Sequence, residues 1–297
     1  MTPQAYCTER VAPPGSALHY SLRGTATDRR NDIIALHALA DELATAAAAS
    51  HDPGVCSARL HWWHGELERA TSDTAQHPVA RALGPALRAG RIPAQWLDDL
   101  ILSSQAEARG LRPPDFAALL AHAHRAGTPI TRCTARVLLT STGASGSRQQ
   151  THETAEPVWL EAATTALGAA AWLVAMLRDV GHDARRGRLY LPIDLMQANG
   201  VAVAALLAAR TGEGVLPGGF KPLLRTLAAA TDQIIGDALG HIPTDARRAL
   251  HPLVALARLQ RTLLAEISAD PQAVMTGRIV LTPVRMLWIT WRAGFGR

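Results

Sequence analysis

Apolar residues recur at helical spacing along almost the whole chain, and this periodicity most limits how the chain can fold. In residues 33–43, isoleucine and leucine return every three or four positions, as on the buried face of an amphipathic helix. Turn-forming residues separate such segments roughly every 15 to 25 positions, about the length of a helix plus its connector. Strand-like alternation is nearly absent. The sequence therefore predicts an all-α protein, and without an internal repeat a single domain is the economical interpretation.

Several predicted helices have clear boundary signals. Pro113-Pro114-Asp115 precedes one of them, because aspartate caps helices and proline suits their entry. Gly127-Thr128-Pro129 should interrupt that helix, since proline lacks the N–H of an interior position. Residues 1–15 are expected to form a flexible arm and the polar residues 141–157 a mobile loop. Helices are expected at residues 33–43, 57–70, 79–89, from 93 onward, 116–126, 130–139, 158–179, 192–210, 223–239, 245–268 and 283–293.

The charge of the chain is positive and diffuse. It has a formal charge of +5 and a pI near 9.7, and Lys221 is the only lysine among its basic residues. Such a charge permits an anionic partner, whether phosphate, nucleic acid or an acidic membrane surface, without selecting one. Arginine without interleaved aromatic residues argues against a single-strand nucleic-acid binder, so we expect no nucleic-acid partner.

The cysteines and the N-terminus indicate a cytoplasmic protein. Cys7, Cys56 and Cys133 are odd in number and lack metal-binding spacing, as expected for unpaired thiols in a reducing compartment. The N-terminus lacks the basic-then-apolar order of a signal peptide. The apolar stretch 162–177 is short for a membrane span and contains threonines. We therefore expect a soluble protein.

One segment leaves peripheral membrane contact open. Residues 285–292 are apolar, contain Trp288 and Trp291, and begin and end with arginine. A helix of this kind can lie at a membrane interface, or it can pack against the core as an ordinary terminal helix. The pattern permits both.

The densest group of chemically active residues follows the most apolar predicted helix. Asp179 and Asp183 are four residues apart, so a continuing helix would project both carboxylates from one face. Two such carboxylates can share a hard cation such as Mg²⁺, and guanidinium groups suit diphosphate oxygens. The alternative is a solvated helix end with i,i+4 ion pairs. The arginines that could hold a diphosphate are Arg178, Arg186 and Arg188.

Other polar clusters are weaker candidates. His61, His64 and Glu68 have spacings that a metal site can use, but a tryptophan helix with a polar outer face explains them equally well. Asp98 and Asp99 point about 100° apart on a helix and cannot grip one ion together. The sequence contains no glycine-rich phosphate loop, nucleophile elbow or spaced cysteine ligands. These patterns identify no catalytic side chain.

The segment from Leu177 to Pro192 resembles the second aspartate-rich signature of the squalene/phytoene synthase family. That signature reads L-R-D-x-x-x-D-x-x-R-G-R-x-Y-L-P, and every specified position is matched here. Weaker similarity extends over nearly the whole chain. Residues 30–39 resemble another family segment, and Trp63, Glu66-Leu67 and His77-Pro78 resemble the next two helices.

The resemblance implies a single-domain, isoprenoid synthase-like helical bundle with a central cavity for prenyl chains. In active members, two aspartate-rich motifs face each other across the cavity and hold Mg²⁺ on diphosphates, so that two prenyl diphosphates join head to head. It implies Mg²⁺ ligands at Asp179 and Asp183 and a prenyl diphosphate, or another isoprenoid, beside them. The implied contact residues are Arg178, Arg186, Arg188 and Tyr190.

The first motif of the family is missing from this chain. It should follow the helix at residues 33–39, where the sequence has Ala44-Thr45-Ala46-Ala47-Ala48. The nearest acids, Asp41 and Glu42, come one turn too early, and His37 replaces a family tyrosine. Losing part of the metal cluster would leave diphosphate charge uncompensated and should remove many decades of rate.

Three functions follow from this comparison. The protein is expected to act in isoprenoid metabolism by binding one prenyl diphosphate with Mg²⁺ through Asp179 and Asp183, without condensing two. An active prenyltransferase that uses Asp41 or Glu42 as substitutes is one alternative. The other is a non-enzymatic assembly or interaction factor, like the family-related factors of respiratory complex I assembly.

Overall fold

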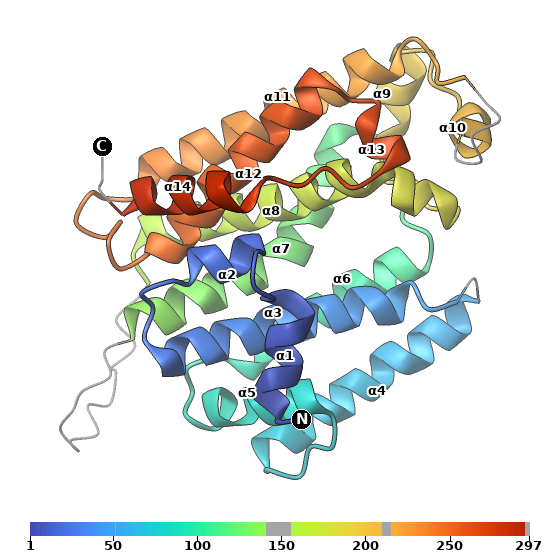
Figure 1. Ribbon diagram of the computed structural model, residues 1–297. Helices are drawn as coiled ribbons and strands as arrows, with labels where there is room; N and C mark the ends of the chain where they lie inside the picture. Colours follow the sequence, from blue (N-terminus) through green and yellow to red (C-terminus); the bar gives the residue numbers. More distant parts are fainter. Residues whose placement is uncertain (51, 141–155, 210–214, 295–297) are drawn as a thin grey trace.

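The computed structural model describes residues 1–50, 52–140, 156–209 and 215–294, and all regular structure within them is helical (Figure 1). The all-α prediction is therefore confirmed. The mobile loop predicted at 141–157 lies almost wholly outside the described residues. The helices are α1 (Pro3–Val11), α2 (Ala17–Ser21), α3 (Thr27–Ala47), α4 (Pro53–Thr71), α5 (Pro78–Arg88), α6 (Ala94–Ala108), α7 (Phe116–Leu139), α8 (Val158–Arg185), α9 (Ile193–Ala198), α10 (Val203–Ala209), α11 (Phe220–His241), α12 (His251–Ala269), α13 (Ala273–Thr276) and α14 (Pro283–Ala293).

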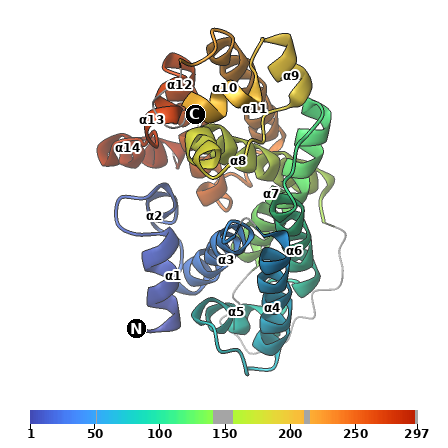
Figure 2. The same ribbon diagram turned by 90° about the vertical axis from the view of Figure 1, so that its right-hand side faces the viewer.

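Helix α8 lies at the centre of the bundle. It packs against α7, α11, α12 and α13. Figures 1 and 2 show α3 to α6 on one side of the α7–α8 pair, with α11 and α12 on the other. Among the described residues, α8 is the one helix long and apolar enough to cross a membrane by length and composition, and most of that stretch is buried inside the protein. Its apolar side chains therefore supply the core that joins the two sides.

Helices α7 and α8 touch backbone to backbone at a glycine pair. A Cβ atom at Gly127 would lie 1.9 Å from the carbonyl oxygen of Gly168, and one at Gly168 would lie 2.6 Å from the Gly127 backbone. Beside this crossing, the hydroxyl of Thr131 donates a hydrogen bond to the carbonyl oxygen of Thr164 at 2.6 Å. Only a residue without a Cβ atom fits here, so the glycines set how closely the central helices approach.

Pro129 does not interrupt its helix, contrary to the prediction. Helix α7 starts after Asp115, whose carboxylate accepts a hydrogen bond from the Ala118 amide as expected of a cap. It then runs unbroken to Leu139 with Pro129 buried inside it. Proline removes one backbone hydrogen bond, but the close packing against α8 holds the segment helical and outweighs the local preference.

Residues 1–15 are not a flexible arm. Helix α1 occupies most of this segment, and the Thr2 hydroxyl caps it by accepting a hydrogen bond from the Ala5 amide. The helix packs on α3 and α5 and buries Cys7, which is free, as are Cys56 and Cys133. Pro3 lies in the first helical turn, where proline has no N–H bond to lose, so it starts a helix rather than preventing one.

Two other boundaries differ from the prediction. The single helix expected at 192–210 is divided into α9 and α10, because Gly200 turns the chain with a φ of 63°. The helix expected at 245–268 begins six residues later as α12, after a turn.

Candidate functional site

The aspartate pair lies in the last two turns of α8. The helix continues through both residues to Arg185, so Asp179 and Asp183 occupy successive turns as their spacing predicted. The chain then reverses at Gly187, whose φ is 73°, and the amides of Arg186 and Arg188 donate hydrogen bonds to the Asp183 carbonyl. This turn brings the second half of the signature back alongside the carboxylates.

A second glycine contact places a distant segment against the same helix end. A Cβ atom at Gly181 would lie 2.4 Å from the carbonyl oxygen of Val274 in α13. Arg185 also donates a hydrogen bond to the Met275 carbonyl at 3.0 Å. With α13 held this closely, the segment after it passes beside the aspartate pair and brings Arg278 into the site.

Asp179 is held by two guanidinium groups. Arg278 donates to its two carboxylate oxygens at 2.9 and 2.8 Å, and Arg178 donates to the same oxygens at 3.0 and 2.7 Å. Burial by itself would raise the pKa of Asp179, but the hydrogen bonds from Arg278 and Arg178 lower it to about 2. The carboxylate is therefore ionised at neutral pH, with both oxygens engaged by the protein. We call this three-residue group the arginine clamp.

Asp183 has the opposite electrostatic environment. Burial raises its pKa most, and the negative charges of Asp179 and Glu107 raise it further, while Arg188 and Arg186 act against them. The result is a pKa of about 7. Near neutral pH Asp179 is therefore ionised, whereas its environment favours the protonated form of Asp183.

This difference predicts an effect of pH on stability. Because the pKa of Asp183 is raised in the folded state, folding favours its protonated form, and stability should fall as the pH rises from about 4 to about 7. Asp183→Asn removes the titration and should raise the melting temperature by several degrees at pH 8. At pH 4 the two proteins should melt within about a degree of each other. An equal difference at both pH values would contradict the assignment.

Glu107 of α6 is a site residue that the sequence analysis missed. Its Oε1 accepts a hydrogen bond from the Trp172 indole at 3.0 Å and lies 3.1 Å from Nε2 of His122. After burial, the charge of Glu107 is the main reason that the pKa of Tyr190 is raised. The Tyr190 and Trp172 rings meet edge to face, with centroids 5.8 Å apart. No motif surrounds Glu107, and only its tertiary partners identify it.

Arg188 spans to the position where the family's first motif is expected. Its Nη2 donates a hydrogen bond to the Ala47 carbonyl oxygen at 2.6 Å, at the C-terminal end of α3. A guanidinium is favoured there, because the last carbonyls of a helix lack partners and carry partial negative charge. The short side chains at residues 44–48 leave this end of α3 open to the arginine. The Arg188 guanidinium thus connects the segment after α8 to the end of α3, where the first motif is expected.

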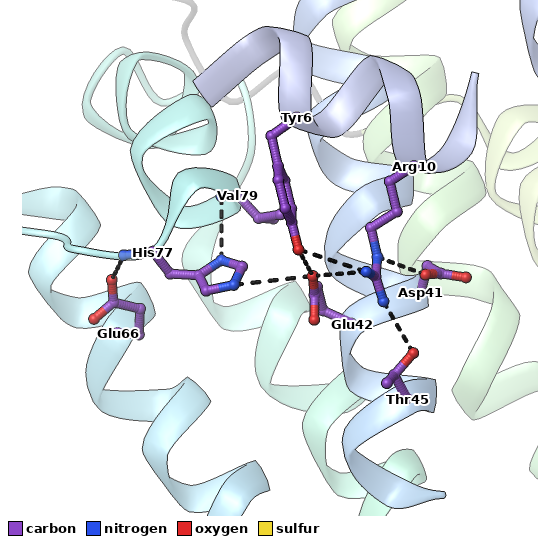
Figure 3. A network of polar contacts seen from close by, with 8 residues as sticks. All are labelled: Tyr6, Arg10, Asp41, Glu42, Thr45, Glu66, His77 and Val79. Carbon is purple, nitrogen blue, oxygen red and sulfur yellow. Dashed lines mark hydrogen bonds and ion pairs between the residues drawn. The ribbon is translucent and has the colours of Figure 1, made fainter. Parts of the chain in front are cut away.

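Asp41 and Glu42, the possible substitutes for the missing motif, are engaged by helix α1 (Figure 3). The Arg10 guanidinium pairs with Asp41 at 2.6 Å and lies 3.3 Å from Glu42. Glu42 also accepts a hydrogen bond from the Tyr6 hydroxyl at 2.6 Å, and its carboxylate lies 3.9 Å from Nε2 of His77. These contacts offset the negative charges of Asp41 and Glu42 at their positions on α3.

The space that reaches Asp183 is narrow. As the side chains stand, it leaves no room for a water molecule, whereas small-molecule sites usually have about 300 to 1,000 Å³. A prenyl chain could enter this space only if neighbouring side chains moved. The lining residues are Met176, Val180, Asp183, Arg188, Leu189, Tyr190 and Leu191.

The family assignment rests on a match over most of the chain. The family model described as squalene/phytoene synthase matches residues 14–285, which include both halves of the site. The chain belongs to the squalene/phytoene synthase family. Its place is therefore in isoprenoid metabolism, as the Leu177–Pro192 signature predicted.

Individual relatives agree with this assignment. A phytoene synthase of Thermus thermophilus is 38% identical over 103 residues, which are 34% of this chain and 32% of that protein. Phytoene synthase 1 of Zea mays is 26% identical over 80% of this chain, although the match spans only 54% of the maize protein. A phytoene synthase of Mycobacterium bovis is 28% identical over 286 residues, covering 95% of this chain and 88% of the relative.

The solved structures show the same fold. A crystal structure of a dehydrosqualene synthase with a ligand has a TM-score of 0.74 and covers 98% of this chain and 95% of its own, at 18% identity. A squalene synthase from Alicyclobacillus acidocaldarius has a TM-score of 0.67 at 15% identity, covering 90% of this chain and 94% of its own. The isoprenoid synthase-like architecture predicted from the sequence is thus confirmed.

In this family member, both oxygens of Asp179 accept hydrogen bonds from guanidinium groups, so a Mg²⁺ ion at this carboxylate would have to displace an arginine. Within the described residues, no group of three or more His, Cys, Asp or Glu is placed to hold a metal ion. His64 lies 3.6 Å from Glu68 through one ring nitrogen and 3.6 Å from Asp98 through the other, but all three side chains are exposed. The Mg²⁺ ligation implied for Asp179 and Asp183 stays a prediction.

The other predicted site residues differ in how closely they approach the aspartates. Arg178, Arg188 and Tyr190 lie close to the aspartates, and the structure adds Arg278 and Glu107 to them. Arg186 caps the end of α8, is exposed, and acts on Asp183 through its charge; within the described residues its side chain makes no hydrogen bond. His37 on α3, the position at which the resemblance implied a tyrosine, has a pKa lowered to about 4 by burial and is a neutral imidazole.

Proposed function

We propose that this squalene/phytoene synthase family member binds the diphosphate end of one prenyl diphosphate at the end of α8, mainly through guanidinium groups. The arginine clamp supports the proposal most directly, because two guanidinium groups share one carboxylate and keep a net positive charge. Arg188 adds a third cation across the site, and Asp183 opposes it only in part because of its raised pKa. Guanidinium groups bind phosphate oxygens in paired, charge-assisted hydrogen bonds.

The proposed ligand is one prenyl diphosphate, and head-to-head condensation is not part of the function. Residues 44–48 provide no carboxylate opposite Asp179, and Asp41 and Glu42 are compensated by Arg10 and Tyr6. Ionising a prenyl diphosphate requires strong electrostatic stabilisation of the departing diphosphate. The clamp offers guanidinium charge for binding, and Asp41, whose charge acts on Arg278, is itself paired with Arg10.

The decisive test is titration of farnesyl diphosphate by calorimetry, once with Mg²⁺ and once with EDTA. We expect binding in both conditions and a roughly tenfold to hundredfold weaker affinity for Arg278→Ala, since a charged hydrogen bond contributes about 1.5–3 kcal/mol. The exposed residue Arg59, on α4, provides the matched control, and Arg59→Ala should bind normally. Binding that requires Mg²⁺ and is unchanged by Arg278→Ala would contradict the proposal.

The substitute-carboxylate alternative is tested in a separate assay. With Mg²⁺ and farnesyl or geranylgeranyl diphosphate, we expect neither diphosphate release nor a condensed hydrocarbon. If turnover is observed and Asp41→Asn abolishes it, the prenyltransferase alternative is correct and the binding-only proposal is wrong.

A further inference from the structure

Helix α14 has two different faces. Its inner face, with Met286 and Ile289, packs against the core beside α2 and α12. Its outer face is apolar and exposed, and the residues recur at helical spacing along one stripe. Figure 2 shows α14 at the outer edge of the molecule, next to α2. The outer residues, with exposed fractions, are Val284 (78%), Leu287 (41%), Trp288 (53%) and Trp291 (61%), and Val280 (75%) precedes the helix.

A group of arginines lies beside this apolar face. Arg258 donates a hydrogen bond to the Arg292 carbonyl at 3.1 Å, and the Arg292 guanidinium lies over the Trp288 ring, 4.7 Å from its centroid. The pKa of Arg258 is lowered by burial and then by the neighbouring charges of Arg247 and Arg292. Among the ion pairs of the described residues, none joins Arg247, Arg258 or Arg292 to a carboxylate. Arg292 thus lies on an aromatic ring, and Arg258 beside it is repelled by both Arg292 and Arg247.

Arg258 also lines a groove that reaches α14. It has a volume of about 650 Å³ and lies between α11, α12 and α14. Arg258, Arg261 and Arg285 line it with Ile289. Arg261 is paired with Asp232 and Arg285 with Glu266, so Arg258 is the lining arginine for which the described residues show no ion pair. The groove is open to solvent, and its lining mixes polar and apolar groups. It therefore suits a charged group of phosphate size better than a buried apolar ligand.

We infer that the outer face of α14 and the adjoining arginines dock the protein onto a membrane surface that contains anionic phospholipids. Tryptophan rings favour the boundary between acyl chains and headgroups, and Val284 and Leu287 would enter the apolar edge of that boundary. Arginines beside the helix are attracted to anionic headgroups, at about 1 kcal/mol for each basic residue near the surface. The two chemistries lie side by side on one face, as an anionic bilayer surface requires.

A second copy of the chain fits this surface less well. A two-fold contact through α14 would place the same group of uncompensated arginines opposite itself. Like charges at such a contact repel, whereas anionic headgroups neutralise them. Charge complementarity therefore selects the lipid surface over self-association.

The test is cosedimentation with vesicles, without any prenyl diphosphate, so that its result is independent of the proposed ligand site. We expect binding to phosphatidylcholine vesicles that contain phosphatidylglycerol, little binding to pure phosphatidylcholine, and weaker binding at high salt. Trp288→Ala/Trp291→Ala should weaken binding at least tenfold, and Arg292→Gln should weaken it and reduce its salt dependence. Circular dichroism checks that the variants are folded.

The exposed residue Trp62 on α4 provides the matched control. Trp62→Ala should bind anionic vesicles as the parent protein does. No cosedimentation at low salt, equal loss in Trp62→Ala, or a dimer in analytical ultracentrifugation that Trp288→Ala/Trp291→Ala dissociates would overturn the inference. Capture of an acidic protein by this face, with no vesicle binding, would overturn it equally.

Discussion

Gly127→Val is expected to unfold the protein under conditions in which the parent chain is stable. A Cβ atom at Gly127 would lie 1.9 Å from the Gly168 carbonyl oxygen and 2.3 Å from its carbonyl carbon. These are backbone atoms of the central helix, so no rotamer change can relieve the overlap. Helices α7 and α8 would have to separate and open voids along their interface. We expect a loss of about 4 kcal/mol or more, a large part of a typical stability of about 5–15 kcal/mol.

Urea unfolding followed by circular dichroism measures this effect, and Gly236→Ala is its matched control. Gly236 also lies within a helix, α11, but a Cβ atom there would meet nothing within 4 Å. Alanine should raise stability by about 0.5–1 kcal/mol, because it restricts the unfolded chain and favours the helix. A Gly127→Val protein within 1 kcal/mol of the parent would show that the two helices do not make this contact.

Glu66→Gln is expected to lower the free energy of unfolding by about 3 kcal/mol. Glu66 is buried, and its Oε1 accepts hydrogen bonds from the amides of Gln76 and His77 at 2.6 and 2.5 Å. Its Oε2 accepts two more from Arg69, at 2.8 and 2.6 Å. Glutamine can accept at one end only, so its NH₂ group would face donors and leave them unpaired.

Two comparisons isolate this effect. Glu68→Gln, two residues along the same helix at an exposed position, should change stability by less than about 0.5 kcal/mol. Burial raises the pKa of Glu66, but hydrogen bonds from His77 and Arg69 outweigh it and lower the pKa overall. The stabilisation is therefore present above the ordinary glutamate range and lost as the pH falls below it, so parent and Glu66→Gln should converge in acid. A constant difference down to pH 2 would contradict this account.

Glu66 is also connected to the acidic residues near the candidate site. By holding the His77 amide, Glu66 fixes the start of α5 and keeps the His77 ring near Glu42 (Figure 3). Glu42 in turn pairs with Tyr6 and Arg10 of α1. The carboxylates closest to the missing first motif are thus part of a structural network joining α1, α3 and α5.

Local patterns predicted most of the helices. The period of apolar residues identified the buried faces, and Asp115 marked a helix start that its side chain caps. The exceptions are positions where tertiary packing outweighs local preference. Pro129 stays helical beside the Gly127–Gly168 contact, and residues 3–11 form a helix because α3 and α5 bury one side of it.

The sequence alone determined the fold class, the family and the helical register of Asp179 and Asp183, because each of these depends on residues close together along the chain. Only the tertiary structure decided what the two carboxylates contact. Arg278 binds Asp179 from 99 positions away, Glu107 faces Asp183 from α6, and Arg188 reaches Ala47 across the bundle. Charge and protonation follow from distances in space. For that reason only the folded protein shows that two arginines hold Asp179, and that burial and neighbouring negative charges raise the pKa of Asp183.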